Sequence, residues 1–144
     1  MYMQKLWVEW FISLFNLKLT LKELSDRKYY FLNIDKSNVP FHTDLSNYIY
    51  SLDNITEETT YSTYHLHKWE QGCYFNEHID SRIGRKWAYV YELQSPICGT
   101  SLLVEGRPEK ECLFNSNTLH RVPVIQQGTR LSLTVFGHNK KTPI

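Results

Sequence analysis

The spacing of apolar residues changes along the first third of the chain. Over residues 4–16, tryptophan, phenylalanine and leucine recur at intervals of three or four positions, which predicts an amphipathic helix. From residue 17 to residue 22, leucine alternates with lysine or threonine, and this period of two predicts a strand. A polar turn at 25–27 then leads into a second predicted strand at 29–34, and helical spacing returns at 43–52.

After a polar loop at residues 53–60, short apolar runs alternate with turn residues. The predicted strands lie at residues 61–69, 73–80, 86–94, 100–105, 110–115, 118–124 and 129–137. Many short strands separated by Gly, Pro and Asn are typical of a β-sandwich or barrel. The length of 144 residues favours one domain over residues 1–144, in which residues 1–60 support a β core at 61–137.

The last predicted strand has two chemically different faces. Its polar residues alternate with apolar ones, namely Arg130, Ser132 and Thr134 against Leu131, Leu133 and Val135. An inward-facing arginine is costly in a plain apolar core, so the polar face predicts a site that holds a carboxylate. The apolar face needs a cover, and the N-terminal helices are available to supply it. We therefore expect these helices outside one sheet and a polar cavity inside it.

The segment His78-Ile79-Asp80 carries the strongest chemical signal. Residues i and i+2 of a strand point to the same side, so His78 and Asp80 would direct an imidazole nitrogen and a carboxylate oxygen at one point. His120 would complete a set of two histidines and one carboxylate, which suits Fe(II) and leaves coordination positions open. A His-x-Asp pair alone is more often a surface feature, but His120 and Arg130 follow it in a fitting order.

Composition narrows the range of partners. The chain is 42% hydrophobic and 22% charged, as is ordinary for a globular domain. Its net charge is only +1 and it has no lysine and arginine stripe, so nucleic acid is not an expected partner. The apolar segment at 6–17 is too short for a membrane span and lacks a signal-peptide pattern, so no membrane partner is expected. Three widely spaced cysteines (Cys73, Cys98 and Cys112) favour free thiols and a cytoplasmic location.

Taken together, these motifs resemble those of the iron(II)- and 2-oxoglutarate-dependent dioxygenases, most closely their prolyl-hydroxylase-like branch. The matching segments are Trp69 and Gly72 before His78-Ile79-Asp80, then Cys98–Leu102, Leu113–Val122 with His120, and Gly128–Leu133 with Arg130. Their order and spacing fit the family, and they cover roughly residues 61–137.

The resemblance implies a mostly β double-stranded β-helix, or jelly roll, with N-terminal helices packed on one sheet. It implies Fe(II) bound by His78, Asp80 and His120, which would be the catalytic centre. It also implies 2-oxoglutarate as cosubstrate, with the far carboxylate bound by Arg130 and Ser132. Ascorbate is a candidate reductant.

The sequence departs from the family pattern at several positions. Where a cosubstrate-binding tyrosine is common before Leu93, this chain has Glu92, and a second carboxylate would be disfavoured there. We therefore expect a one-residue shift that makes Tyr91 the inward, cosubstrate-binding residue. Trp69 stands where the family often has another tyrosine, and Cys98 replaces one glycine of a common pair.

The activity implied by the resemblance is hydroxylation coupled to release of succinate and carbon dioxide. A peptidyl residue, with proline favoured, is the expected substrate. Short loops favour an open groove over a sealed pocket, and Phe136 stands where the related nucleic-acid demethylases have a second arginine. Two alternatives stay open: hydroxylation of a free small molecule, and a jelly-roll module that binds metal without turnover.

Two other histidines, His65 and His67, are also spaced for one face of a strand. No further ligand follows them at a suitable distance, so a packed or solvated strand face is the better interpretation. The oligomeric state cannot be predicted from the sequence.

Overall fold

The computed structural model describes residues 3–52, 59–80 and 82–140. Its helices are α1 (Lys5–Ser13) and α2 (His42–Tyr50), with short 3₁₀ turns η1 (Leu14–Asn16) and η2 (Lys36–Asn38). Its strands are β1 (Thr20–Leu24), β2 (Arg27–Asp35), β3 (Thr59–Thr60), β4 (Thr63–Trp69), β5 (Tyr74–His78), β6 (Arg85–Gln94), β7 (Leu102–Val104), β8 (Arg107–Glu109), β9 (Glu111–Asn115), β10 (His120–Val122) and β11 (Arg130–Asn139). Within these residues, neither helix is long or apolar enough to cross a membrane.

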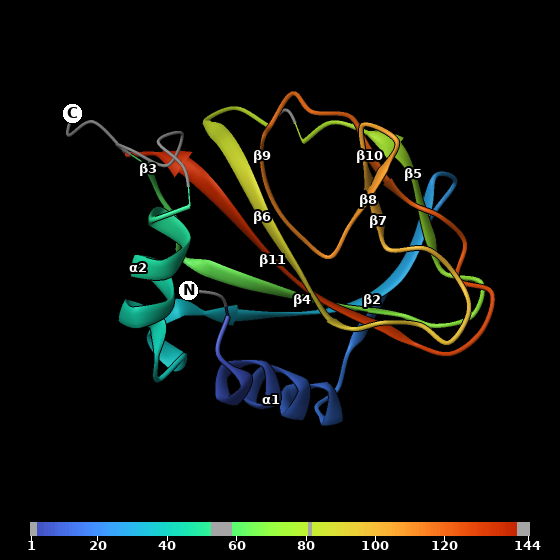
Figure 1. Cartoon of the computed structure of the whole chain (residues 1–144), viewed down its shortest axis with the longest axis horizontal. Helices are drawn as coiled ribbons and strands as arrows, with labels where there is room; N and C mark the ends of the chain where they lie inside the picture. The colour runs from blue at the N-terminus through green and yellow to red at the C-terminus, as the bar shows by residue number, and fades with distance from the viewer. Residues whose placement is uncertain (1–2, 53–58, 81, 141–144) are drawn as a thin grey trace.

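The strands form one antiparallel sheet that curls over on itself (Figure 1). Hydrogen-bonded neighbours follow the order β8-β7-β10-β5-β2-β4-β11-β6-β9, with β1 beside β2 and β3 beside β11. Strands far apart in this order meet through their inner faces, since Ala88 and Val90 of β6 share a buried cluster with Leu102 and Val104 of β7. The predicted mostly β jelly roll is confirmed.

The two helices lie against the outer face of the sheet, below and beside β4, β6 and β11 in Figure 1. The apolar residues of β11 (Leu131, Leu133 and Val135) form one cluster with residues of α1 (Trp7 and Phe11) and of α2 (Leu45 and Ile49). Phe11, Leu45, Ile49 and Leu133 are fully buried. The predicted cover of the outer face is therefore present, and the polar face of β11 is left for the interior.

Several element boundaries differ from the predicted ones. β5 ends at His78, so Asp80 follows the strand instead of lying within it. Residues 106–109 were expected to connect two predicted strands, but Arg107–Glu109 pairs with β7 as an edge strand. Glu105 and Gly106 join the two strands with φ angles of 50° and 78°, which are the positive values of a tight type I′ hairpin.

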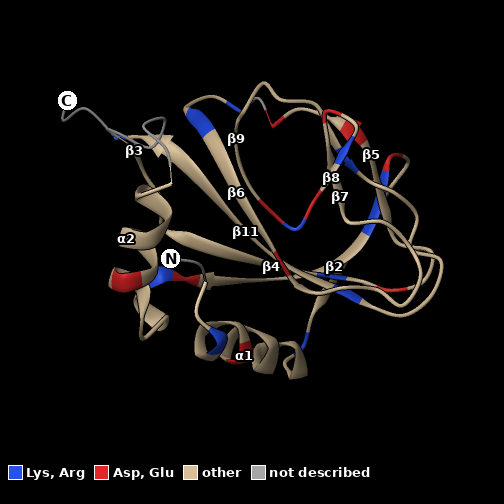
Figure 2. Ribbon diagram, in the orientation of Figure 1, with Lys and Arg blue, Asp and Glu red and all other residues tan. Residues whose placement is uncertain are grey.

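Only the last two residues of the predicted loop at 53–60 belong to the described part of the chain. Thr59 and Thr60 form β3 against the end of β11, whereas residues 53–58 lie outside the described residues. Charged residues of both signs are interspersed over the ribbon (Figure 2), in keeping with the small net charge.

Candidate metal centre

Strand pairing brings the two candidate histidine ligands together. β5 and β10 are antiparallel neighbours, and His78 lies directly opposite His120 in their register. Side chains of directly opposed residues lie on the same face of a sheet, so both imidazoles enter the interior. Asp80 follows two residues after His78, where its backbone N–H donates to the carbonyl oxygen of Ser116 at 3.0 Å.

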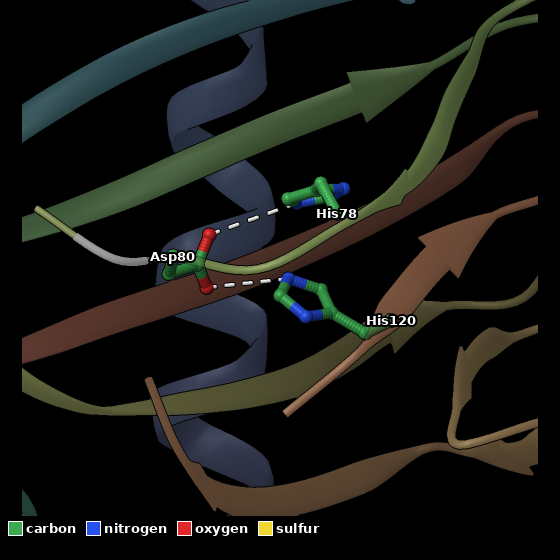
Figure 3. Close-up of side chains that lie close together, drawn as sticks. All are labelled: His78, Asp80 and His120. Atoms are coloured by element: carbon green, nitrogen blue, oxygen red, sulfur yellow. Dashed lines mark ion pairs between the residues drawn. The ribbon is translucent and has the colours of Figure 1, made fainter. Parts of the chain in front are cut away.

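The three side chains converge on one point (Figure 3). The Nε2 atoms of His78 and His120 lie 3.6 Å and 3.2 Å from the two carboxylate oxygens of Asp80. One potential ligand atom from each residue lies within 4.8 Å of the others. A set of two imidazole nitrogens and one carboxylate oxygen fits Fe(II) and would leave further coordination positions open.

The other nitrogen of each imidazole is already engaged by the backbone. His78 Nδ1 lies 2.7 Å from the carbonyl oxygen of Asn76, and His120 Nδ1 lies 2.9 Å from that of Thr118. A carbonyl oxygen only accepts hydrogen bonds, so each Nδ1 carries the proton. The unprotonated Nε2 of each neutral ring is then free to bind a metal, and the ring is held in orientation.

Electrostatics at the centre favour a cation. Burial lowers the pKa of the His78 imidazole. Burial acts in the same direction on His120, but the hydrogen bond and charge of Asp80 outweigh it and raise the His120 pKa above its ordinary 6.5. Burial also opposes ionisation of Asp80, yet the His120 hydrogen bond and the charges of both imidazoles lower the Asp80 pKa. Asp80 is therefore an anion that attracts either a proton or a metal ion to this point.

A cavity of about 540 Å³ inside the curled sheet is lined by the candidate metal ligands His78, Asp80 and His120. The polar face of β11 lines it with Arg130, Ser132 and Thr134, as the alternation along that strand predicted. Trp69 also lines it, and its indole N–H donates to the Ser132 hydroxyl oxygen at 3.0 Å. The Ser132 hydroxyl hydrogen is thus available to a group inside the cavity.

Arg130 is the buried cation of this cavity, with only 1% of its surface exposed. Its Nε donates to a carboxylate oxygen of Glu92 at 2.8 Å, and the face of Trp69 lies 5.7 Å from the guanidinium carbon. Burial lowers the pKa of this guanidinium, against the opposing effect of Glu92. Its Nη2 is buried and has no hydrogen-bond partner among the described residues. A ligand carboxylate would satisfy this nitrogen, so the residues present fit the far end of 2-oxoglutarate.

The prediction that Tyr91 faces inward is wrong. Tyr91 packs against the outer cluster under the helices, and Glu92 is the inward residue. Strand alternation explains the error, because Trp87, Tyr89 and Leu93 all belong to the outer cluster and share their parity with Tyr91. A lone carboxylate would be unfavourable inside, but Glu92 is paired with Arg130.

Two further groups of cavity residues were not recognised as functional from the sequence. His65 and His67 line the wall on β4, and burial lowers their pKa values to about 4 and about 3, so both rings are neutral there. Arg85 also lines the cavity, where its guanidinium stacks 3.6 Å above the ring of Phe136 and its buried Nε has no partner within the described part of the chain. Only the register of the sheet, which the sequence does not reveal, places these side chains inside.

Comparison with known proteins identifies the fold. No protein-family model and no curated protein matches the sequence. A prolyl-4-hydroxylase of Pseudomonas putida is similar in structure with a TM-score of 0.72 and 17% identity, over 97% of this chain and 90% of that one. The viral collagen prolyl hydroxylase of Paramecium Bursaria Chlorella virus-1, in its 2-oxoglutarate complex, is similar with a TM-score of 0.71 and 12% identity, over 96% of this chain and 92% of that one. A 2OG-Fe(II) oxygenase family protein of Burkholderia pseudomallei is similar with a TM-score of 0.65 and 14% identity, over 91% of this chain and 76% of that one.

Proposed function

We propose that this protein is an Fe(II)- and 2-oxoglutarate-dependent dioxygenase that hydroxylates a peptidyl residue, with proline favoured. One observation carries the proposal: the His78, Asp80 and His120 cluster and the unpaired Nη2 of buried Arg130 line the same cavity. The cluster fits the metal and the guanidinium fits the far carboxylate of the cosubstrate. The fold shared with two prolyl hydroxylases and a 2OG-Fe(II) oxygenase supports the assignment.

The chain contributes binding and orientation. Bound Fe(II) and 2-oxoglutarate supply the oxidative chemistry, in which the cosubstrate is converted to succinate and carbon dioxide as the substrate is hydroxylated. His78, Asp80 and His120 would hold the ion, and a set of three protein ligands would leave coordination positions for cosubstrate and oxygen. Asp80 contributes the negative charge of the ligand set, and the neutral imidazoles contribute none.

Arg130 and Ser132 fix the cosubstrate at its other end. Arginine presents a planar set of donors that suits a carboxylate better than the point charge of lysine. Nη2 of Arg130 and the hydroxyl of Ser132 lie on the same face of β11 and both line the cavity. Their burial removes competing water, which strengthens these hydrogen bonds.

Arg85 supports a peptide as the substrate. Its Nε is buried without a partner in the described chain, so this N–H lacks an acceptor oxygen, and its guanidinium carbon lies over the ring of Phe136. A peptide offers a carbonyl oxygen on both sides of the oxidised residue. Arg82 and Lys22 also line this cavity.

An assay of 2-oxoglutarate turnover tests the proposal. Iron-loaded protein should release succinate when given proline-containing peptides, and more slowly with free amino acids. The His78→Ala and Asp80→Ala variants should lose this activity because each removes a metal ligand. Turnover with free amino acids alone would favour the small-molecule alternative. Absence of succinate with every substrate would favour a binding module.

Arg130 provides a separate test of the cosubstrate site. Arg130→Ala should weaken 2-oxoglutarate binding on the order of tenfold to a hundredfold, since a hydrogen bond to a charged group contributes about 1.5–3 kcal/mol. Metal affinity should hardly change, because Arg130 does not contact the three ligands. Arg130→Lys serves as the control for loss of the buried ion pair, because it keeps a cation beside Glu92. If calorimetry shows wild-type 2-oxoglutarate affinity in Arg130→Ala, the carboxylate assignment is wrong.

A further inference from the structure

Glu92 lies behind the arginine that lines the cavity. Its side chain is fully buried, with 0% exposed, and it is not among the residues that line the cavity. Arg130 does line the cavity, so the guanidinium separates the Glu92 carboxylate from the space where a ligand would sit. The cation of the proposed cosubstrate site therefore has a built-in counter-charge.

Both oxygens of the Glu92 carboxylate are engaged. One oxygen, Oε1, accepts from Arg130 Nε at 2.8 Å. The other, Oε2, accepts from the hydroxyls of Ser95 at 2.7 Å and Ser101 at 3.1 Å. These hydroxyls hold Oε2 away from the guanidinium, which would otherwise take it as the second half of a two-pronged pair.

This arrangement leaves the Nη2 atom of Arg130 free to bind a ligand. Because Oε2 is occupied by the serines, Nη2 has no partner among the described residues although it is buried. The guanidinium is fixed through Nε and cannot turn away from the cavity. The pair of Arg130 and Glu92 is formally neutral, so an entering carboxylate meets an oriented hydrogen-bond donor and not an uncompensated cation.

From this geometry, and resting on the proposed function, we propose that Glu92 is a positioning residue that sets a low affinity of the site for 2-oxoglutarate. It orients Arg130 toward the cosubstrate, and its charge opposes the negative charge of the carboxylate that Arg130 binds. A site built this way fills at higher concentrations of 2-oxoglutarate than a site whose arginine has no carboxylate partner.

The size of the effect follows from Coulomb's law. Two carboxylates on different edges of one guanidinium stand roughly 6 Å apart, and at an effective dielectric constant of about 20 their repulsion corresponds to on the order of a hundredfold in affinity. Removing the Glu92 charge while keeping its shape should therefore tighten 2-oxoglutarate binding by about tenfold or more.

The test compares Glu92→Gln with Glu111→Gln by calorimetric titration of 2-oxoglutarate into the zinc-loaded protein. The glutamine at 92 can still accept from Arg130 Nε through its amide oxygen, so Arg130 keeps its place. Glu111 provides a matched control, because its carboxylate accepts from Tyr48 and Tyr89 on the outer side of the sheet. We expect about tenfold tighter binding in Glu92→Gln and wild-type binding in Glu111→Gln.

A second variant tests the same idea if Glu92→Gln does not fold. The Ser95→Ala, Ser101→Ala double variant keeps the charge but frees Oε2 to bind Nη2, so 2-oxoglutarate affinity should fall several-fold. A purely structural role for Glu92 predicts a lower melting temperature without tighter binding in Glu92→Gln. Folded Glu92→Gln that binds 2-oxoglutarate no more tightly than wild type, or unchanged affinity in the double variant, overturns the proposal.

The outcomes separate this proposal from the function on which it rests. If the wild type releases succinate and Glu92→Gln binds no more tightly, only the role of Glu92 is rejected. Binding detected in Glu92→Gln but not in the wild type supports the role of Glu92. If neither protein binds 2-oxoglutarate and neither releases succinate, both the function and the role of Glu92 are rejected.

Discussion

At the scale of single residues, a proton and a metal ion would compete for the candidate metal centre. Asp80 raises the pKa of His120 above 6.5, so below that pH the imidazole carries a proton that must leave before a metal ion binds. Asp80 itself stays ionised, because its pKa is lowered from 3.8. Metal affinity should therefore be constant at alkaline pH and fall by up to about tenfold per pH unit below the pKa of His120.

Titration with Co(II) between pH 5.5 and pH 8 measures this dependence. His138→Ala is a suitable control, because His138 lies at the far end of β11 opposite Thr60 and should not alter it. Equal metal affinity at both ends of the pH range would contradict the coupling between Asp80 and His120.

The same coupling affects the stability of the protein without metal. The raised pKa of His120 contributes stability that is present at low pH and is lost as the pH rises through its folded value, above 6.5. The lowered pKa of Asp80 contributes stability that is present above 3.8 and is lost as the pH falls below it. The interaction of Asp80 with His120 therefore stabilises the fold most strongly between the ordinary pKa values of the two groups, 3.8 and 6.5.

Residue chemistry was the most predictable part of the site. The period-two spacing of His78 and Asp80, the distal His120 and the polar face of Arg130 and Ser132 all place side chains in the same cavity. Glu92 was misjudged because a sequence shows the cost of burying a carboxylate but not the three donors that compensate it, which come from Arg130, Ser95 and Ser101.

At the scale of elements, the pairing of β6 with β11 fixes both the cavity and the outer core. Gly137 of β11 lies opposite Trp87 of β6, and a Cβ atom on Gly137 would approach Trp87 Cε2 to 1.9 Å. Trp87 is fully buried and donates from its indole nitrogen to Thr59 Oγ1 at 2.8 Å. The absence of a side chain at residue 137 is therefore required by the position of the indole.

Gly137→Ala should lower the free energy of unfolding by about 1–3 kcal/mol, because the indole or the strand must shift to admit the methyl group. Chemical denaturation measures the loss, and the loss should be smaller in a Trp87→Phe background, where the colliding part of the indole is absent. A wild-type unfolding free energy in Gly137→Ala would show that the two strands are not packed this closely.

Strand identities were largely predictable, whereas their ends and pairing were not. The alternation of residues between the two faces of a strand predicted β4, β6 and β11, because each of these strands is long enough to repeat the pattern several times. β8 was missed because Pro108 and Gly106 indicate a turn, although proline is tolerated in an edge strand such as β8. The inward positions of His67 and Arg85 depend on long-range register, which local sequence does not encode.

At the scale of the whole molecule, stability and chemistry occupy opposite faces of one sheet. The outer face packs on α1 and α2 (Figure 1). The inner face carries the candidate metal ligands and Arg130, which line the cavity. Phe11 of α1 is fully buried in the outer cluster and contacts Tyr64 with ring centroids 5.6 Å apart. Changes to this cluster should therefore affect folding without altering the site.

Phe11→Ala should lower the free energy of unfolding by about 3–5 kcal/mol, through lost burial and the cavity left behind. Leu6→Ala on the same helix is the matched control, because Leu6 is 73% exposed and its replacement should cost little. At temperatures where Phe11→Ala remains folded, its metal affinity should equal that of the wild type. A folded Phe11→Ala variant with weakened metal binding would show that the two faces are not independent.

The most direct test of the account is diffraction at the iron absorption edge from crystals grown anaerobically with Fe(II) and 2-oxoglutarate. We predict one anomalous peak bounded by His78, Asp80 and His120, and density for the cosubstrate that ends with its far carboxylate on Arg130 Nη2. Iron bound elsewhere, or a cosubstrate that leaves Arg130 without contact, would contradict it.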